Sequence, residues 1–173
     1  MKEKLECLMT KMNEIKYGYV IDGVNIYSDL ENDKEMNEDF PKLYHLLSPD
    51  ELIKNKHGVC WDQVELERYY LSLDNIVCSS YFIVEYDDKF YPTHTFVVVS
   101  CNNKFYWFEH SWYPYRGIHE YDSLNELLKD VKLKFSKDKN IDDIVIYNYE
   151  KPKYGISSNE FFKHCEEGKR VNI

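Results

Sequence analysis

The stretch HTFVVVSCNNKFYWFEH, residues 94–110, contains two runs of β-branched and aromatic residues joined by the dipeptide Asn102-Asn103. Runs of this composition are typical of β-strands. Asparagine tolerates the positive φ angles that a two-residue hairpin turn requires. The stretch therefore predicts an antiparallel hairpin, around which the rest of the fold must be arranged.

More strands and several helices are expected on both sides of this hairpin. Residues 75–86 and 143–150 share its richness in Val, Ile, Phe and Tyr and are predicted to be strands. Helices are predicted over residues 3–16, 49–55, 60–73, 123–135 and 157–169. Because helices come first and an antiparallel sheet follows, the sequence predicts an α+β fold in which a central helix packs on that sheet.

Two connecting segments are expected to be loops. Residues 19–40 are acidic, and we expect SDLENDKEMNEDF (28–40) to be a solvated loop or helix face, with an acidic docking segment as the alternative. RGIHEY (116–121) is expected to join the sheet to the following helix, with Arg116 in an ion pair. Gly18 is expected to cap the end of the first helix.

The composition excludes several classes of protein. With 173 residues the chain is expected to form one domain, residues 1–173. A net charge of −9 argues against a nucleic-acid partner. The five cysteines are scattered and form no CxxC motif, so neither a disulfide framework nor a structural metal is expected, and a reducing compartment fits. A charged N-terminus and the lack of a long apolar run favour a cytoplasmic protein without a membrane partner.

The register of the hairpin determines which polar side chains meet. A two-residue turn would place Phe96 opposite Glu109, and His94 shares a face with Phe96. His94 and Glu109 then become diagonal neighbours, with Cβ atoms roughly 7–8 Å apart. His110 falls on the opposite face and is expected to be a hydrogen-bonded structural group.

A cysteine stands at the head of the helix predicted over 60–73. In HGVCWDQVELE (57–67), Cys60 follows Gly58, which permits a tight approach to the helix. A thiol reacts as its thiolate, which the positive end of a helix dipole and a neighbouring imidazolium both favour. A lone cysteine is more often a small packed side chain, so this stretch by itself leaves both interpretations open.

Three blocks of sequence carry a resemblance to a known family. GVCWD (58–62), HTFVVV (94–99) and YWFEHSW (106–112) resemble the motif blocks of the transglutaminase-like superfamily, which are cysteine enzymes with a papain-like fold. The resemblance covers about residues 45–125, and a small bacterial-type single-domain member is the best description. One departure is that the family usually has Asp where this chain has Glu109.

The resemblance implies a role for each of three residues. Cys60 would be the nucleophile, His94 the general base and acid, and Glu109 the carboxylate that orients the imidazole. The backbone N–H of Cys60, in the first helical turn, would help to bind an oxyanion. The resemblance implies no metal or organic cofactor.

The side chain that would complete the oxyanion site is not identified by the resemblance. Tyr17, Tyr19 and Gln63 are the candidates that the sequence offers. Trp61 and Trp112 are expected to be either core residues or walls of the cleft, and Trp112 is a candidate for shaping an acyl pocket.

Three functions remain open at this point. The first is acyl transfer on a peptide or protein substrate, in which the thiol forms a thioester that water or an amine resolves, with hydrolysis favoured over transamidation. The second is a catalytically inactive peptide-binding or interaction module of the same fold; the joint presence of Cys, His and a carboxylate argues against it. The third is an acidic interaction protein whose helices 3–16 and 157–169 dock a partner.

Overall fold

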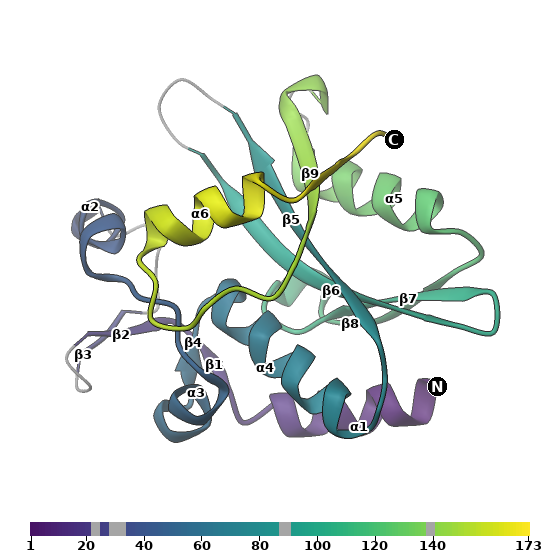
Figure 1. Ribbon diagram of the computed structural model, residues 1–173, viewed down its shortest axis with the longest axis horizontal. Helices are drawn as coiled ribbons and strands as arrows, with labels where there is room; N and C mark the ends of the chain where they lie inside the picture. The colour runs from purple at the N-terminus through teal and green to yellow at the C-terminus, as the bar shows by residue number, and fades with distance from the viewer. Residues whose placement is uncertain (22–24, 28–33, 87–90, 138–140) are drawn as a thin grey trace.

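A computed structural model describes residues 1–21, 25–27, 34–86, 91–137 and 141–173. These residues form helices packed on an antiparallel sheet, so the predicted α+β class is confirmed. The central sheet has the strand order β10-β9-β5-β6-β7-β8 (Figure 1). Its strands are β5 (Cys78–Glu85), β6 (Thr93–Cys101), β7 (Lys104–Glu109), β8 (Gly117–Tyr121), β9 (Ile144–Tyr149) and β10 (Lys169–Val171).

The β6–β7 hairpin has the register that the sequence predicts. Asn102 and Asn103 both adopt positive φ angles, 51° and 59°, as the two central positions of a tight hairpin turn require. Val98 consequently pairs with Trp107. The ladder ends at Val97 and Phe108, one pair before the predicted Phe96–Glu109 pair, while β6 continues beside β5 as far as Thr93. The two strands of the hairpin therefore part at the end where His94 and Glu109 lie.

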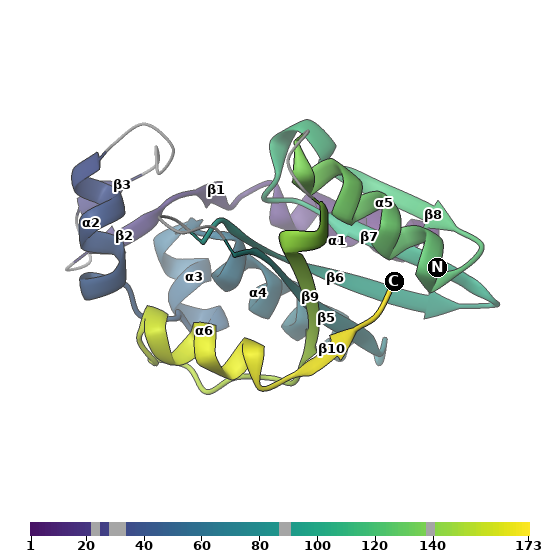
Figure 2. The ribbon, with the colours of Figure 1, turned by 90° about the horizontal axis from the view of Figure 1, so that it is seen from above.

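Helices cover both faces of the sheet. One face packs against α1 (Lys2–Met12), α3 (Pro49–Asn55), α4 (Cys60–Leu73) and α6 (Ser158–Glu166), and the other packs against α5 (Leu124–Ser136). The alternation of side chains along a strand produces the two cores: on β5, Phe82 and Val84 join the first and Tyr81 and Ile83 the second. Figure 2 shows the sheet between α5 and α4.

Helix α4 lies at the centre of the first core. It begins at Cys60 and ends at Leu73, as predicted, and its first eight residues are all buried. Several of these residues are polar or acidic, including Asp62, Gln63 and Glu67. Burying a polar group costs free energy unless the group is hydrogen-bonded, so each of these side chains is expected to have a hydrogen-bond partner.

Three connections differ from the predictions. The predicted loop is wrong where β2 (Tyr19–Ile21) pairs with β3 (Asn25–Tyr27). Helix α2 (Lys34–Leu43) follows, so the second form expected for the acidic segment 28–40, a helix, is the one present over residues 34–40. Residues 22–24 and 28–33 lie outside the described residues. RGIHEY is not a loop, because β8 pairs with β7 along its length. The first helix ends at Met12, well before Gly18, which therefore does not cap it.

The missed elements are short and depend on distant partners. Strand β1 (Lys16–Tyr17) pairs in parallel with β4 (His57–Gly58), a contact between segments about forty residues apart. Two short 3₁₀ helices, Tyr113–Tyr115 and Ile141–Asp143, complete the described elements. No helix in the described part of the chain combines the length and apolar character that crossing a bilayer requires.

Candidate active site

The N-terminus of α4 is held by the side chain of Asp62. Asp62 Oδ2 accepts a hydrogen bond from the backbone N–H of Val59 (2.9 Å), the residue that precedes the helix. Its other oxygen accepts from Tyr44 Oη (2.6 Å) and from the backbone N–H of Leu47 (2.9 Å). Burial raises the pKa of Asp62 to about 7, although these three hydrogen bonds favour its charged form. One carboxyl group thus ties the start of the helix to residues 44–47.

Gly58 allows the chain to approach the helix closely. A Cβ atom at this position would lie 2.5 Å from Leu52 Cδ1 and 2.9 Å from Asp62 Cβ, closer than real Cβ contacts. Only glycine therefore fits at this last position of β4, next to α4, without displacing a neighbour. The expected tight approach before Cys60 is present, and it places Cys60 at the first position of the helix.

His94 and Glu109 are in direct contact where β6 and β7 part. His94 Nε2 lies 2.7 Å from Glu109 Oε2. Glu109 Oε1 accepts hydrogen bonds from the backbone N–H of Trp112 (2.8 Å) and from Ser111 Oγ (3.2 Å). Both oxygens of this carboxyl group are therefore held, and its side chain is 1% exposed.

The third member of this group is Cys60. Burial lowers the pKa of His94, but the charge of Glu109 and hydrogen bonds with the side chains of Cys60 and Glu109 outweigh it and raise the pKa to about 10. His94 is therefore protonated at neutral pH. Because Nε2 faces Glu109, Nδ1 is the ring nitrogen left for the thiol. The arrangement places a positive charge beside the sulfur of Cys60.

A second carboxyl group, Glu67, is buried near this group and was not identified from the sequence. Burial, and next the charge of Glu109, raise the pKa of Glu67 well above its ordinary value, which keeps it neutral. The helical repeat gives a signal that could have found it, because Glu67 lies two turns after Cys60 on the same side of α4. Asp62, at the third helical position, had a weaker signal, because acidic residues are favoured in the first turn of a helix.

The side chain of Gln63 links the segment before Cys60 to the segment after Glu109. Its Nε2 donates to the carbonyl of Gly58 (2.7 Å), and its Oε1 accepts from His110 Nδ1 (2.6 Å). Burial, and next the charge of Arg116, lower the pKa of His110 to about 4, so the ring is neutral and Nδ1 is its donor. Both ends of the Gln63 amide are engaged, which argues against the predicted use of this side chain as an oxyanion donor. His110 is hydrogen-bonded and takes no part in the His94–Glu109 pair, as predicted, but its partner lies on α4, so the predicted position on the sheet face away from that helix is wrong.

Replacing Gln63 with leucine is expected to destabilise the fold and slow the reaction of Cys60 together. The substitution leaves the Gly58 carbonyl and the His110 ring without partners, at about 1–3 kcal/mol for each group. Urea unfolding and the rate of Cys60 alkylation by iodoacetamide measure the two effects. Asn125→Leu, at an exposed amide on α5, is the matched control. Equal stability of Gln63→Leu and wild type would show that the Gln63 hydrogen bonds contribute nothing.

Tyr19, a candidate oxyanion donor, and Trp61, expected to be a core residue or a cleft wall, both lie in the aromatic core. Trp61 is 6% exposed and stacks on Phe161 with ring centroids 4.6 Å apart. Tyr19 is buried and packs edge-on against Phe40 and Tyr44. These contacts explain both residues as packing groups.

Tyr17 and Trp112 lie closer to the candidate residues. Tyr17 is half-buried on β1 and pairs with Gly58, two positions before Cys60. The ring of Trp112 lies 5.1 Å from that of His94, and its backbone N–H holds Glu109. Trp112 thus packs against both His94 and the second core, and its role as a cleft wall stays a prediction.

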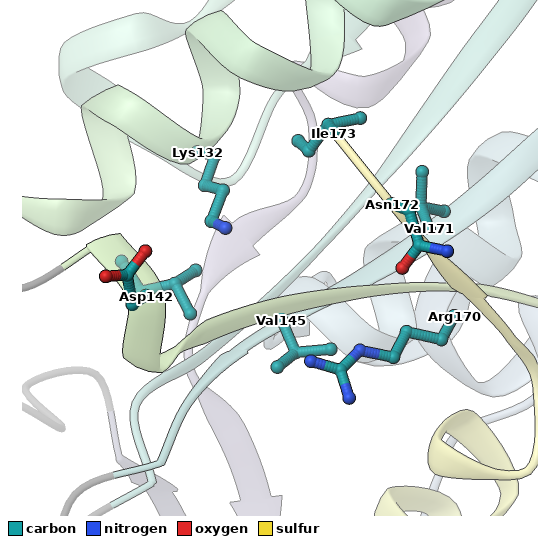
Figure 3. A pocket seen from close by; sticks show the side chains of 8 residues that line it. Lys132, Asp142, Val145, Arg170, Val171, Asn172 and Ile173 are labelled. Atoms are coloured by element: carbon teal, nitrogen blue, oxygen red, sulfur yellow. The ribbon is translucent and has the colours of Figure 1, made fainter.

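A surface cavity of about 180 Å³ lies elsewhere, between α5, β9 and β10. Its lining includes Lys132, Val145 and Arg170 (Figure 3) but none of the residues around Cys60. Among the residues that the structure describes, no three His, Cys, Asp or Glu side chains gather in a way that could hold a metal ion.

Comparison with known proteins identifies one family. A family model described as a transglutaminase-like domain matches residues 3–147, a stretch that contains Cys60, His94 and Glu109. A comparison with curated proteins found no match.

Proposed function

Because this chain belongs to the transglutaminase-like domain family, we propose that it is a cysteine-dependent acyl-transfer enzyme that acts on peptide or amide bonds through a thioester. The observation that carries the proposal is the His94–Glu109 pair, 2.7 Å apart, together with Cys60 at the first position of a buried helix, close enough to His94 to contribute to the raised pKa of its ring. In the proposed resting state, a thiolate, a protonated imidazole and a carboxylate in this order supply a nucleophile, a proton carrier and the group that orients the carrier.

In the first step, the sulfur of Cys60 attacks the carbonyl carbon of the substrate and forms a C–S bond. The carbonyl oxygen gains negative charge, which the backbone N–H of Cys60 stabilises, since N–H groups in a first helical turn lack an intrahelical acceptor. His94 gives its proton to the leaving nitrogen as the C–N bond breaks. The amine departs, and the acyl group remains on Cys60 as a thioester.

In the second step, His94 is neutral and accepts a proton from the incoming nucleophile, which attacks the thioester carbon. The C–S bond breaks, and Cys60 leaves as a thiolate beside the reprotonated imidazole. Water yields a carboxylic acid, and an amine yields a new amide. We favour hydrolysis, because water needs no binding site of its own whereas an acceptor amine does.

The proposed setting is a single cytoplasmic domain with a peptide or protein substrate. Two features support it: the five cysteines are all free thiols, and the net charge is −9. A reducing compartment keeps thiols free, and a strongly acidic protein repels the phosphates of nucleic acids.

The proposal predicts that Cys60 reacts with iodoacetamide faster than any other cysteine of the folded protein. Cys60 is 5% exposed, whereas Cys7 is exposed, so reactivity that simply follows exposure would place Cys7 first. Burial raises the pKa of Cys78 to about 11 and that of Cys165 further, which keeps both unreactive at neutral pH. Peptide mapping by mass spectrometry after timed labelling gives the order of reaction.

Two further results separate an enzyme from an inactive binding module. An active enzyme forms a thioester on Cys60 with a reactive acyl donor and releases it with time, and Cys60→Ala forms none. Labelling of all five cysteines at equal rates, or fastest at Cys7, would contradict the proposed function.

A further inference from the structure

Residues 110–116 form a wall beside the Cys60–His94–Glu109 group. Ser111 and the backbone of Trp112 hold the Glu109 carboxyl group, and the Trp112 ring packs on His94. Arg116 closes this segment at its other end, because its Nε donates to the carbonyl of His110 (2.8 Å). The guanidinium of Arg116 is thereby held against the backbone of His110, the residue that follows Glu109.

The positive charge of Arg116 has no acidic partner among the described residues. The predicted ion pair is therefore wrong. Its guanidinium instead lies over the Tyr113 ring, 4.2 Å from the centroid. In a chain with 31 acidic and 22 basic residues, a half-buried guanidinium without an acidic partner is available to an anion from outside.

The geometry of Arg116 suits a carboxylate. Only its Nε has a hydrogen bond within the described part of the chain, and a guanidinium has five N–H donors in a planar fork. Stacking on Tyr113, which is 57% exposed, holds that plane fixed at a solvent-accessible position. A fixed fork binds carboxylates bidentately and loses little entropy in doing so.

The position of His94 indicates which part of a substrate would reach Arg116. In the proposed reaction His94 must lie within hydrogen-bonding distance of the leaving nitrogen. The leaving-group side of the substrate therefore passes over His94, and the wall beside His94 is formed by Trp112 and the residues that follow it. An extended peptide advances about 3.3–3.6 Å per residue, so the first two residues on the leaving-group side span roughly 7 Å along this segment. Arg116 belongs to the same segment, because its Nε is hydrogen-bonded to the carbonyl of His110, the residue after Glu109.

We propose that Arg116 binds a carboxylate on the leaving-group side of the substrate, one or two residues from the scissile bond. The site thus prefers substrates whose amine component is acidic. This inference rests on the proposed function, because it takes Cys60 as the nucleophile and His94 as the proton donor.

Matched thiol-reactive peptides test the preference. N-chloroacetyl dipeptide amides extend from the reactive carbon toward the leaving-group side, and the Cys60 sulfur displaces chloride from them. Pairs that carry Glu or Gln at the first or second residue differ only in charge. We expect Glu to react faster than Gln in the wild type, and the ratio of the two rates to fall about tenfold in Arg116→Gln, as for loss of a charge-assisted hydrogen bond. Because both peptides of a pair react with the same thiol, the ratio does not depend on a change in the reactivity of Cys60.

The controls separate a local contact from overall charge. Arg170→Gln removes the same charge from β10, at the opposite edge of the sheet, and should keep the wild-type ratio. Arg116→Lys keeps the charge but not the fork, and should give an intermediate ratio. A wild-type ratio of one or less overturns the inference even if the variants fail to fold, and so does a ratio that survives in Arg116→Gln. The Gln peptides report on the proposed function: if they fail to label Cys60 ahead of Cys7, the proposed function fails as well.

Discussion

Replacing His94 with alanine is expected to lower turnover by about 10²–10⁴-fold, the range that general acid–base catalysis contributes. The variant loses both the positive charge beside the Cys60 sulfur and the group that protonates the leaving amine. Alkylation of Cys60 by iodoacetamide at neutral pH should slow as well. Because this second readout needs no substrate, it can be measured before the substrate is known.

The control for this variant is His45→Ala. His45 is exposed, and its ring is hydrogen-bonded to the carbonyl of Leu43, so its loss should leave the alkylation of Cys60 unchanged. If His94→Ala reacted as fast as wild type, His94 would have no part in the reaction, and the raised pKa of its ring would be a purely structural property.

Replacing Glu109 with glutamine is expected to have an effect of similar size, about 10²–10⁴-fold on turnover. One oxygen of Glu109 accepts from His94, and the other accepts from Trp112 and Ser111. Glutamine has a single oxygen, so its NH₂ group must face a donor on one side or the other. The charge that raises the pKa of His94 is lost at the same time, while the burial that lowers it remains.

A pH profile distinguishes this mechanism from a general loss of structure. In the wild type, the protonated His94 persists up to its pKa of about 10, so activity should fall only above that pH. In Glu109→Gln that upper limit should move down by several pH units. Glu109→Asp retains the charge with a shorter reach and should lie between the two. Glu120→Gln, at an exposed carboxylate on β8, should keep the wild-type profile.

The same ion pair makes stability depend on pH in a defined direction. His94 has a pKa of about 10 in the folded chain, compared with an ordinary value of 6.5. The folded state therefore holds the proton more tightly, and this stabilisation is complete below about pH 6.5 and is lost as the pH rises toward 10. The difference in unfolding free energy between wild type and Glu109→Gln should shrink over that interval. A difference that stays constant from pH 6 to 10 would show that the pair does not couple protonation to folding.

The sequence predicts those parts of the structure that depend on local geometry. The Asn102–Asn103 turn determines the hairpin register, and the register places His94 against Glu109. The bounds of α4 are also predicted, because the break at Gly58 precedes a run without Gly or Pro.

What the sequence does not predict depends on contacts between distant segments. Gln63 is engaged by His110, 47 positions away, and no periodicity within α4 indicates such a partner. Strand β8 has the composition of a loop and becomes a strand because the exposed edge of β7 supplies hydrogen bonds. Arg116 was expected to pair with an acid because the chain is acidic, but its contacts are with a backbone carbonyl and an aromatic ring.

The turn at Asn102–Asn103 has a consequence for the order in which the chain acquires its reactivity. Ribosomes make Cys60 before His94 and Glu109, which lie on the two strands of one local hairpin. The imidazole and the carboxylate meet as soon as that hairpin closes, but the thiol joins them only when α4 packs on the sheet, which closes a longer loop at a greater entropic cost. Under the proposed mechanism, a nascent chain therefore exposes only ordinary thiols, and Cys60 becomes reactive only when folding is complete.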